Sequence, residues 1–358
     1  MGFCIRLLTI PKGFSQKTPP RTLIQIILLF FATLYKFLSR FIFMISRRLL
    51  RIKIIQVLYA YFSTPLEDRD PVRSEKELFF SIQKTEDLYG FLLLLPLALR
   101  NLTESKIEQA RNKKLPTQSD LNPNLRLVND PFVEMLSQGA PLMALATERK
   151  LNWAPYPDLV RMIYNAMVES PEYETFMLSD LSDFEASQKF WSEFYGKIAA
   201  ESAVLFESLE ELSIFWNDDI EFVLSQIIKT VKQQSSGSQL QIFPLFKEEE
   251  DREYATRLFR KTLANSKEYR TLIEAHTQNW DLERIAFMDI IIMQTAIAEL
   301  VEFPSIPVSV TFNEFIELAK FYSTPRSSTF VNGILDKITA GLKESGAIVK
   351  HGRGLIEK

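Results

Sequence analysis

The chain has 358 residues, of which 46% are hydrophobic and 24% are charged, and only 11 are glycine. This length allows two or three domains with a sizeable core, and the shortage of glycine favours helix over sheet. The single cysteine, Cys4, excludes a disulfide within the chain and fits a reducing compartment such as the cytoplasm. The two histidines, His276 and His351, provide almost no material for a zinc site or a histidine-based catalytic centre.

The net charge of −3 conceals an asymmetry along the chain. Residues 1–60 carry ten lysines and arginines and no acid, which leaves −13 for the remainder. A basic N-terminal segment followed by an acidic remainder indicates contact with a polyanion at the N-terminal end of the chain. The alternative is a targeting segment or a solvated face, and for residues 1–43 we favour that alternative.

Residues 1–43 form a basic and apolar N-terminal extension. Its uncharged run Thr22–Tyr35 is shorter than the roughly 20 residues of a membrane span, and no small-residue cleavage site follows it. A second methionine, Met44, directly precedes an arginine-rich segment. We therefore expect residues 1–43 to be an over-long start assignment, with a weak membrane anchor or an ordered extra helix as the alternatives.

Helical patterns then follow in chain order. Ser46 is a candidate N-cap for a helix over 46–62, which is basic in its first turns and apolar almost all round thereafter. Two helices are expected over 74–113, broken near Pro96, and a loop over 114–130. Further helices are expected at 131–150, 157–168, 171–179, 184–212 and 218–233, and, beyond a flexible polar linker at 233–239, at 248–264, 267–278, 281–301, 311–321 and 326–343. The fold class is all-α, and the polar tail around Gly352-Arg353-Gly354 is expected to be disordered.

The chain lacks the usual signatures of an enzyme. Neither a dinucleotide-binding glycine pattern nor a P-loop pattern is present. The acidic pairs Glu210-Glu211 and Asp218-Asp219 are adjacent in sequence, so on a helix their side chains point about 100° apart and cannot straddle one bond. We expect no catalytic residues, no cofactor and no metal site.

Three groups of residues carry the most specific signal. The first is Arg47-Arg48-x-x-Arg51, followed by Gln56-x-Leu58-Tyr59; the second is Arg284-Ile-Ala, followed later by Ala298-Glu299-Leu300; the third is the pair of strings NEFIELAK at 313–320 and FVNGILDK at 330–337. This succession resembles the NusB family of bacterial transcription antitermination factors. The resemblance implies a NusB-like helical bundle built from 44–63 and 248–343, with a large helical insertion over 64–247 and a polar tail over 344–358.

The resemblance also implies a function. A chain of this kind binds boxA-type single-stranded leader RNA together with NusE, the ribosomal protein that doubles as an elongation factor. It thereby promotes processive transcription of ribosomal RNA operons, with RNA polymerase an indirect partner. Two alternatives stay open: a NusB-like domain of a ribosomal RNA methyltransferase, and a membrane-tethered helical scaffold that uses Thr22–Tyr35, although membrane contact is not the main expectation.

The candidate site residues follow from this resemblance and from the chemistry of the side chains. Guanidinium groups at an exposed helix start can hold phosphates, although charge alone favours a solvated face. The expected RNA-binding residues are Arg47, Arg48, Arg51, Lys53, Tyr59 and Phe330, and the expected partner-binding residues are Glu299, Arg326 and Asn332. The alternatives are core packing for Phe330 and close helix packing at Asn332 and Gly333. Arg326 stands where many relatives carry an acid, so the charge of this turn differs from theirs.

Overall fold

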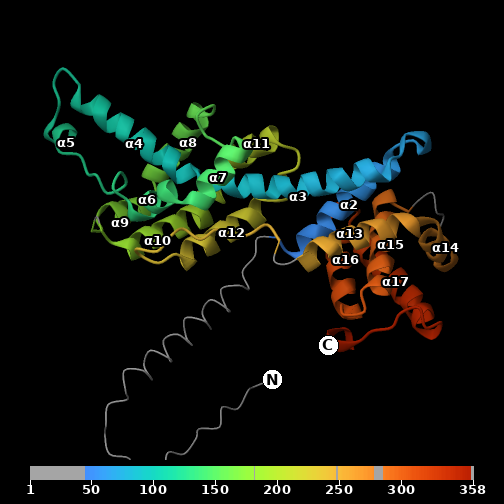
Figure 1. Ribbon diagram of the computed structural model, residues 1–358. Coiled ribbons are helices and arrows are strands. Elements are labelled where there is room, and N and C mark those ends of the chain that lie inside the picture. Colours follow the sequence, from blue (N-terminus) through green and yellow to red (C-terminus); the bar gives the residue numbers. More distant parts are fainter. Residues whose placement is uncertain (1–44, 181, 247–248, 278–284, 356–358) are drawn as a thin grey trace, which may run out of the picture. The chain divides into compact units, whose positions relative to one another are not determined.

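The computed structural model describes residues 45–180, 182–246, 249–277 and 285–355. The chain divides into two units, Met1–Ile42 and Phe43–Lys358, and every described residue belongs to the second. The expectations for residues 1–43 therefore lie outside the described residues. In the described part, all regular elements are helical (Figure 1), which confirms the all-α class.

The elements follow one another along the chain with short connections. The first part holds α2 (Arg47–Ser63), η1 (Leu66–Asp68), α3 (Pro71–Leu93), α4 (Leu95–Arg111), α5 (Gln118–Leu121), α6 (Pro131–Gln138), α7 (Ala140–Arg149), α8 (Pro157–Val168) and α9 (Pro171–Met177). The second part holds α10 (Phe184–Glu193), the π-helix η2 (Phe194–Ala199), α11 (Ala203–Leu212), α12 (Ile220–Gln233), α13 (Glu249–Ala264), α14 (Ser266–His276), α15 (Phe287–Glu302), α16 (Val308–Tyr322), α17 (Ser327–Glu344) and η4 (Gly352–Leu355).

Two hydrophobic clusters form the interior of this unit. The first, called core 1, takes its buried side chains from α2, the start of α3 and helices α13 to α17. The second, core 2, takes them from the rest of α3, from α4 and from α6 to α12, together with nearby loop residues. Helix α3 belongs to both clusters, because Leu78 and Ile82 lie in core 1 and Leu88 lies in core 2. Figure 1 shows α3 running between the two groups of helices.

The helices of core 1 begin where the sequence supplies suitable caps. Ser46 accepts a hydrogen bond from the Leu49 amide at the start of α2. Asp70 accepts from two amides at the start of α3, where Pro71 occupies the first helical position. Helix α15 is buried on nearly every side from Asp289 to Leu300, as expected for a helix that is apolar all round.

Two expected helices are interrupted. The helix expected over 131–150 is two helices that meet at Gly139, where an added Cβ would lie 2.3 Å from Leu240 Cδ2. The helix expected over 184–212 passes through the π-helix η2 and then ends before α11. The first break coincides with Pro141 at the second position of α7, because a proline cannot continue the preceding helix. Helical periodicity alone reveals neither break.

Two segments expected to be flexible are held in place. In the polar linker, Gln234 is buried, and its side-chain amide donates hydrogen bonds to the carbonyls of Thr230 and Gln241. In the tail, the amide of His351 donates to the Pro304 carbonyl. The Lys350 ammonium donates to the carbonyls of Leu300 and Phe303, which are end carbonyls of α15 without partners inside the helix. The expectation of a disordered tail is therefore wrong for residues up to 355.

Candidate nucleic-acid interface

The basic residues of α2 are distributed over different environments. Arg47 is half-buried and forms ion pairs with Glu250 at 2.7 Å and Asp251 at 3.3 Å, both in the first turn of α13. Burial lowers the pKa of Arg47, but the hydrogen bonds to Glu250 and Asp251 outweigh it and raise the pKa. Arg48 is exposed to solvent. Most of the charge of Arg47 is thus offset within the protein, whereas Arg48 remains accessible.

Arg51 is buried, which contradicts its expected place on an exposed basic surface. Its side chain is 3% exposed and grips Glu299 in bidentate fashion, with N···O distances of 2.7 and 2.9 Å. A second carboxylate, Glu314, lies 3.7 Å from the same guanidinium. Burial opposes the charged form, but Tyr254 and Glu299 outweigh this and raise the pKa of Arg51. The expectation of an exposed Arg51 is wrong because α13, α15 and α16 cover it.

Glu299 is the centre of that buried network and not an exposed surface residue. Its side chain is fully buried, and it accepts hydrogen bonds from Arg51, the Tyr254 hydroxyl and the Thr311 hydroxyl. Burial, and then the charge of Glu299, raise the pKa of Tyr254 well above its usual value. The expectation that Glu299 faces a partner protein is wrong for this arrangement, because the carboxylate joins α2, α13, α15 and α16 inside the protein.

Lys53 is likewise buried, with 1% of its side chain exposed. Its ammonium lies 2.8 Å from Asp219 and donates to the Phe215 carbonyl at 2.8 Å. Asp219 also accepts a hydrogen bond from the Thr85 hydroxyl. The expectation of an exposed Lys53 is therefore wrong, because the turn before α12 packs against this side of α2.

One stripe of α2 stays accessible along the helix. It runs through Arg48, Ile52, Gln56 and Tyr59, at the spacings of four and three residues that place side chains on one face. Tyr59 is 42% exposed and packs against Phe287, itself 37% exposed, with ring centroids 5.5 Å apart. The stripe thus combines a cation, an amide and two exposed aromatic rings.

The start of α17 lies next to the aromatic end of this stripe. The Ser327 hydroxyl donates to Asp289 at 2.7 Å, which fastens the start of α17 to the first turn of α15, where Phe287 also lies. Arg326 and Asn332 are exposed and Phe330 is partly buried against core 1. An added Cβ on Gly333 would meet nothing within 4 Å, so close helix packing does not explain that glycine.

The sequence does not indicate the acidic partners Glu250, Asp251 and Asp219, but it contains a signal that two of the basic residues are buried. Arg51 shares a helical face with Ile55 and Leu58, and Lys53 shares one with Leu50 and Val57. A charged side chain inside an apolar stripe is a candidate for a buried ion pair. The identity of the partners depends on long-range packing, which the helical period does not contain.

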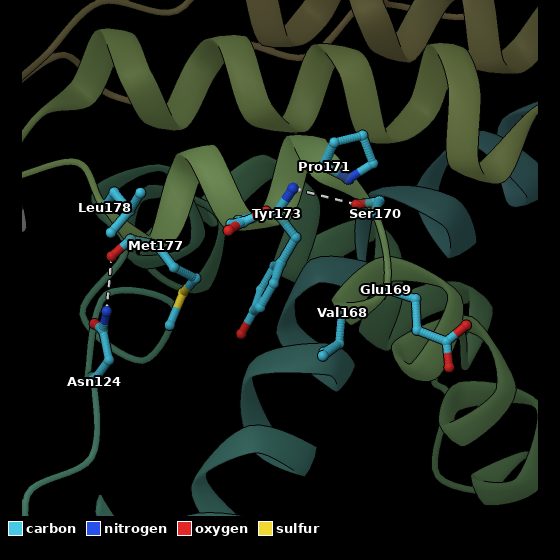
Figure 2. A pocket seen from close by; sticks show the side chains of 9 residues that line it. Asn124, Val168, Glu169, Ser170, Pro171, Tyr173, Met177 and Leu178 are labelled. Carbon is cyan, nitrogen blue, oxygen red and sulfur yellow. Dashed lines mark hydrogen bonds between the residues drawn. The ribbon is translucent and has the colours of Figure 1, made fainter.

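An open pocket of about 460 Å³ lies beside α9 and offers no catalytic arrangement. Its lining includes Val168, Glu169, Tyr173, Met177 and Leu178. Figure 2 shows its two hydrogen bonds, from the Tyr173 amide to Ser170 and from the Asn124 amide to the Met177 carbonyl. Both bonds hold the ends of α9. Among the described residues, no cluster of His, Cys, Asp and Glu is placed to hold a metal ion, and no helix is long and apolar enough to cross a membrane.

Known proteins of similar sequence identify the family of this chain. The NusB family model matches residues 208–340. The transcription antitermination protein NusB of Salinibacter ruber is 41% identical over 139 residues, which cover 87% of that protein and 37% of this chain. The chain belongs to the NusB family. The NusB protein of Chloroherpeton thalassium is 40% identical over 106 residues, which cover 50% of that protein and 30% of this chain. The NusB protein of Koribacter versatilis is 41% identical over 95 residues, which cover 65% of that protein and 26% of this chain. No solved structure matches the chain.

The family assignment confirms the resemblance found in the sequence. Relatives that carry the name NusB are transcription antitermination proteins, so the chain belongs to a family of such factors. The matched stretch begins at residue 208, inside the segment expected to be an insertion. The boundaries of 44–63, 64–247 and 248–343 remain a prediction.

Proposed function

We propose that this protein is an RNA-binding transcription antitermination factor whose RNA surface is the accessible stripe of α2. The observation that carries the proposal is the continuous run of Arg48, Gln56, Tyr59 and Phe287 on one exposed face, next to Arg326 at the start of α17. In this proposal, residues 44–63 and 248–343 form the NusB-like bundle, and 64–247 form its insertion. Core 1 supports that division, because its side chains come from α2 and from α13 to α17, with a contribution from the start of α3.

The stripe has the two kinds of contact that single-stranded RNA needs. Arg48 and Arg326 are exposed cations able to hold backbone phosphates. Tyr59 and Phe287 present aromatic surface on which unpaired bases can stack. Phe330 is partly buried and supports this end of the surface. Arg51 and Lys53 act indirectly, because their buried ion pairs hold α2 in position.

The proposed RNA is a boxA-type leader, and the proposed protein partner is NusE. Arg326 and Asn332, both exposed at the start of α17, are the candidate partner contacts. Glu299 is excluded from this role in the folded protein by its burial. Processive transcription of ribosomal RNA operons, with RNA polymerase contacted indirectly, is the activity we infer.

Binding of a fluorescent boxA-type single strand, followed by anisotropy, tests the proposal. Arg48→Glu and Tyr59→Ala should each weaken binding about fivefold or more, because a hydrogen bond to a charged group contributes about 1.5–3 kcal/mol and a stacked base about 1–3 kcal/mol. Arg48→Ala should also lower the slope of log affinity against log salt by about 0.7, the value for one lost phosphate contact on a single strand.

The matched control is Arg161→Glu, which makes the same charge change on α8, a helix distant from α2 in sequence. The Arg161 side chain is 61% exposed. It should leave affinity nearly unchanged. If Arg48→Glu and Arg161→Glu have equal effects, the α2 stripe is not the RNA surface. Replacing Arg47, Arg48 and Arg51 together is a poorer test, because loss of the buried Arg51 would also destabilise the fold.

A further inference from the structure

The turn before α12 brings two adjacent acids of the insertion against the proposed RNA helix. Asp219 points inward and pairs with Lys53 at 2.8 Å. Asp218 is exposed and accepts a hydrogen bond from the side-chain amide of Gln56. The inward pair anchors the turn, and the outward carboxylate lies on the accessible stripe.

Gln56 stands between Arg48 and Tyr59 in that stripe, so Asp218 sits within the proposed RNA path and not beside it. The Tyr322 hydroxyl also faces this carboxylate: burial first, and then Asp218, raise the pKa of Tyr322, while Arg48 lowers it. The charges of Arg48 and Asp218 therefore both act on the Tyr322 hydroxyl. The side-chain hydrogen bond that Asp218 accepts comes from Gln56, a neutral amide.

The Asp218 carboxylate accepts a hydrogen bond from the Gln56 amide, as a phosphate oxygen of bound RNA would. The Gln56 amide is the type of donor that contacts RNA backbones, and here an internal acid already uses it. An RNA phosphate that approaches the same donor meets a full negative charge, and like charges at short range repel.

We propose that Asp218 restrains RNA binding by occupying the middle of the α2 stripe, so that the insertion limits the affinity of the bundle for RNA backbone phosphate. The inference rests on the proposed function and extends it by naming an internal competitor. Displacement of the turn frees the Gln56 amide between Arg48 and Tyr59, and loss of the charge removes the repulsion. Asp219 does not compete directly, because its pairing with Lys53 lies beneath the surface.

The test is the affinity of Asp218→Asn for the same labelled single strand at low and high salt. Asparagine has nearly the same shape and can still accept from Gln56, so only the charge is lost. We expect binding about threefold to tenfold tighter than wild type at low salt, because a nearby like charge is removed. The gain should shrink at high salt, which screens exposed charges. Asp218→Ala, which also removes the hydrogen bond, should show an equal or larger gain.

Glu221→Gln is the matched control, because it removes the same charge from an exposed residue in the first turn of α12, three positions along the chain. Equal affinities for Asp218→Asn and Glu221→Gln would refute the restraint, as would weaker binding by Asp218→Asn. Arg48→Glu separates the two proposals. If wild type binds and Arg48→Glu does not, while Asp218→Asn changes nothing, only the restraint fails. If wild type, Arg48→Glu and Asp218→Asn all fail to bind RNA, the proposed function fails and the restraint falls with it.

Discussion

Neighbouring basic residues of α2 differ in role because their surroundings differ. Arg48 faces solvent, whereas Arg51, one turn further on, is enclosed with Glu299, Tyr254 and Thr311. A buried ion pair of this kind can add little net stability compared with an apolar pair, yet removal of one partner leaves a costly unpaired charge. The residue types on α2 therefore suggested one basic surface, and the packing divides them into a surface group and a structural group.

Replacement of Glu299 by alanine should therefore destabilise the protein strongly. Among the described carboxylates the Arg51 guanidinium would keep Glu314 alone, at 3.7 Å, so the expected loss is about 3–5 kcal/mol of unfolding free energy. Urea unfolding followed by circular dichroism measures it. The control is Glu317→Ala, which removes a surface partner of Lys320 and should cost less than about 0.5 kcal/mol. A loss for Glu299→Ala as small as that of the control would show that the carboxylate is not part of a buried network.

At the scale of elements, the sequence predicted most helices but not every helix end. Strong periodicity located α8, α12, α13 and α17 to within a few residues. The break at Gly139 and the π-helix η2 were missed, although Pro141 is a local signal for the first. The ordered tail was missed because it is held by contacts with residues about 50 positions away in sequence. Its polar, glycine-containing sequence resembles a disordered segment until it is seen against α15.

Two glycines near the C-terminus should respond oppositely to alanine. An added Cβ at Gly354 would lie 1.9 Å from the Pro304 carbonyl oxygen, a backbone atom that cannot easily move. Gly354→Ala should therefore release the tail, speed exchange of the His351 amide, and cost about 1–3 kcal/mol as an overpacked contact does. Gly333 is helical and an added Cβ there meets nothing within 4 Å, so Gly333→Ala should stabilise by about 0.5–1 kcal/mol. Hydrogen exchange with denaturant unfolding distinguishes the two, and destabilisation by Gly333→Ala would contradict the expectation.

At the scale of the whole described unit, two hydrophobic cores are joined by a shared helix and by polar links. Helix α3 passes through both cores, and the Lys53–Asp219 pair connects α2 of core 1 to the start of α12 of core 2. The candidate RNA helix could be predicted from its arginines and its resemblance to the NusB family. The restraint by Asp218 could not, because it requires residues more than 150 positions apart to meet.

The Lys53–Asp219 link leads to a prediction about cooperativity. Lys53→Met would leave the buried Asp219 with the Thr85 hydroxyl as its remaining described side-chain partner. The loss should be about 3–5 kcal/mol, concentrated where the two cores meet. Scanning calorimetry should then show core 1 and core 2 melting in two transitions where wild type melts in one, because the contact that couples them is weakened.

Two comparisons make this result specific to the link. Lys337→Met, on the exposed side of α17, should leave the melting profile unchanged. The double variant Lys53→Met with Asp219→Leu removes both charges and should recover part of the lost stability, since an apolar pair can replace a buried ion pair at little cost. A single, unshifted transition for Lys53→Met would mean that α3 alone couples the cores. In that case the buried pair would only position the Asp218 turn on α2.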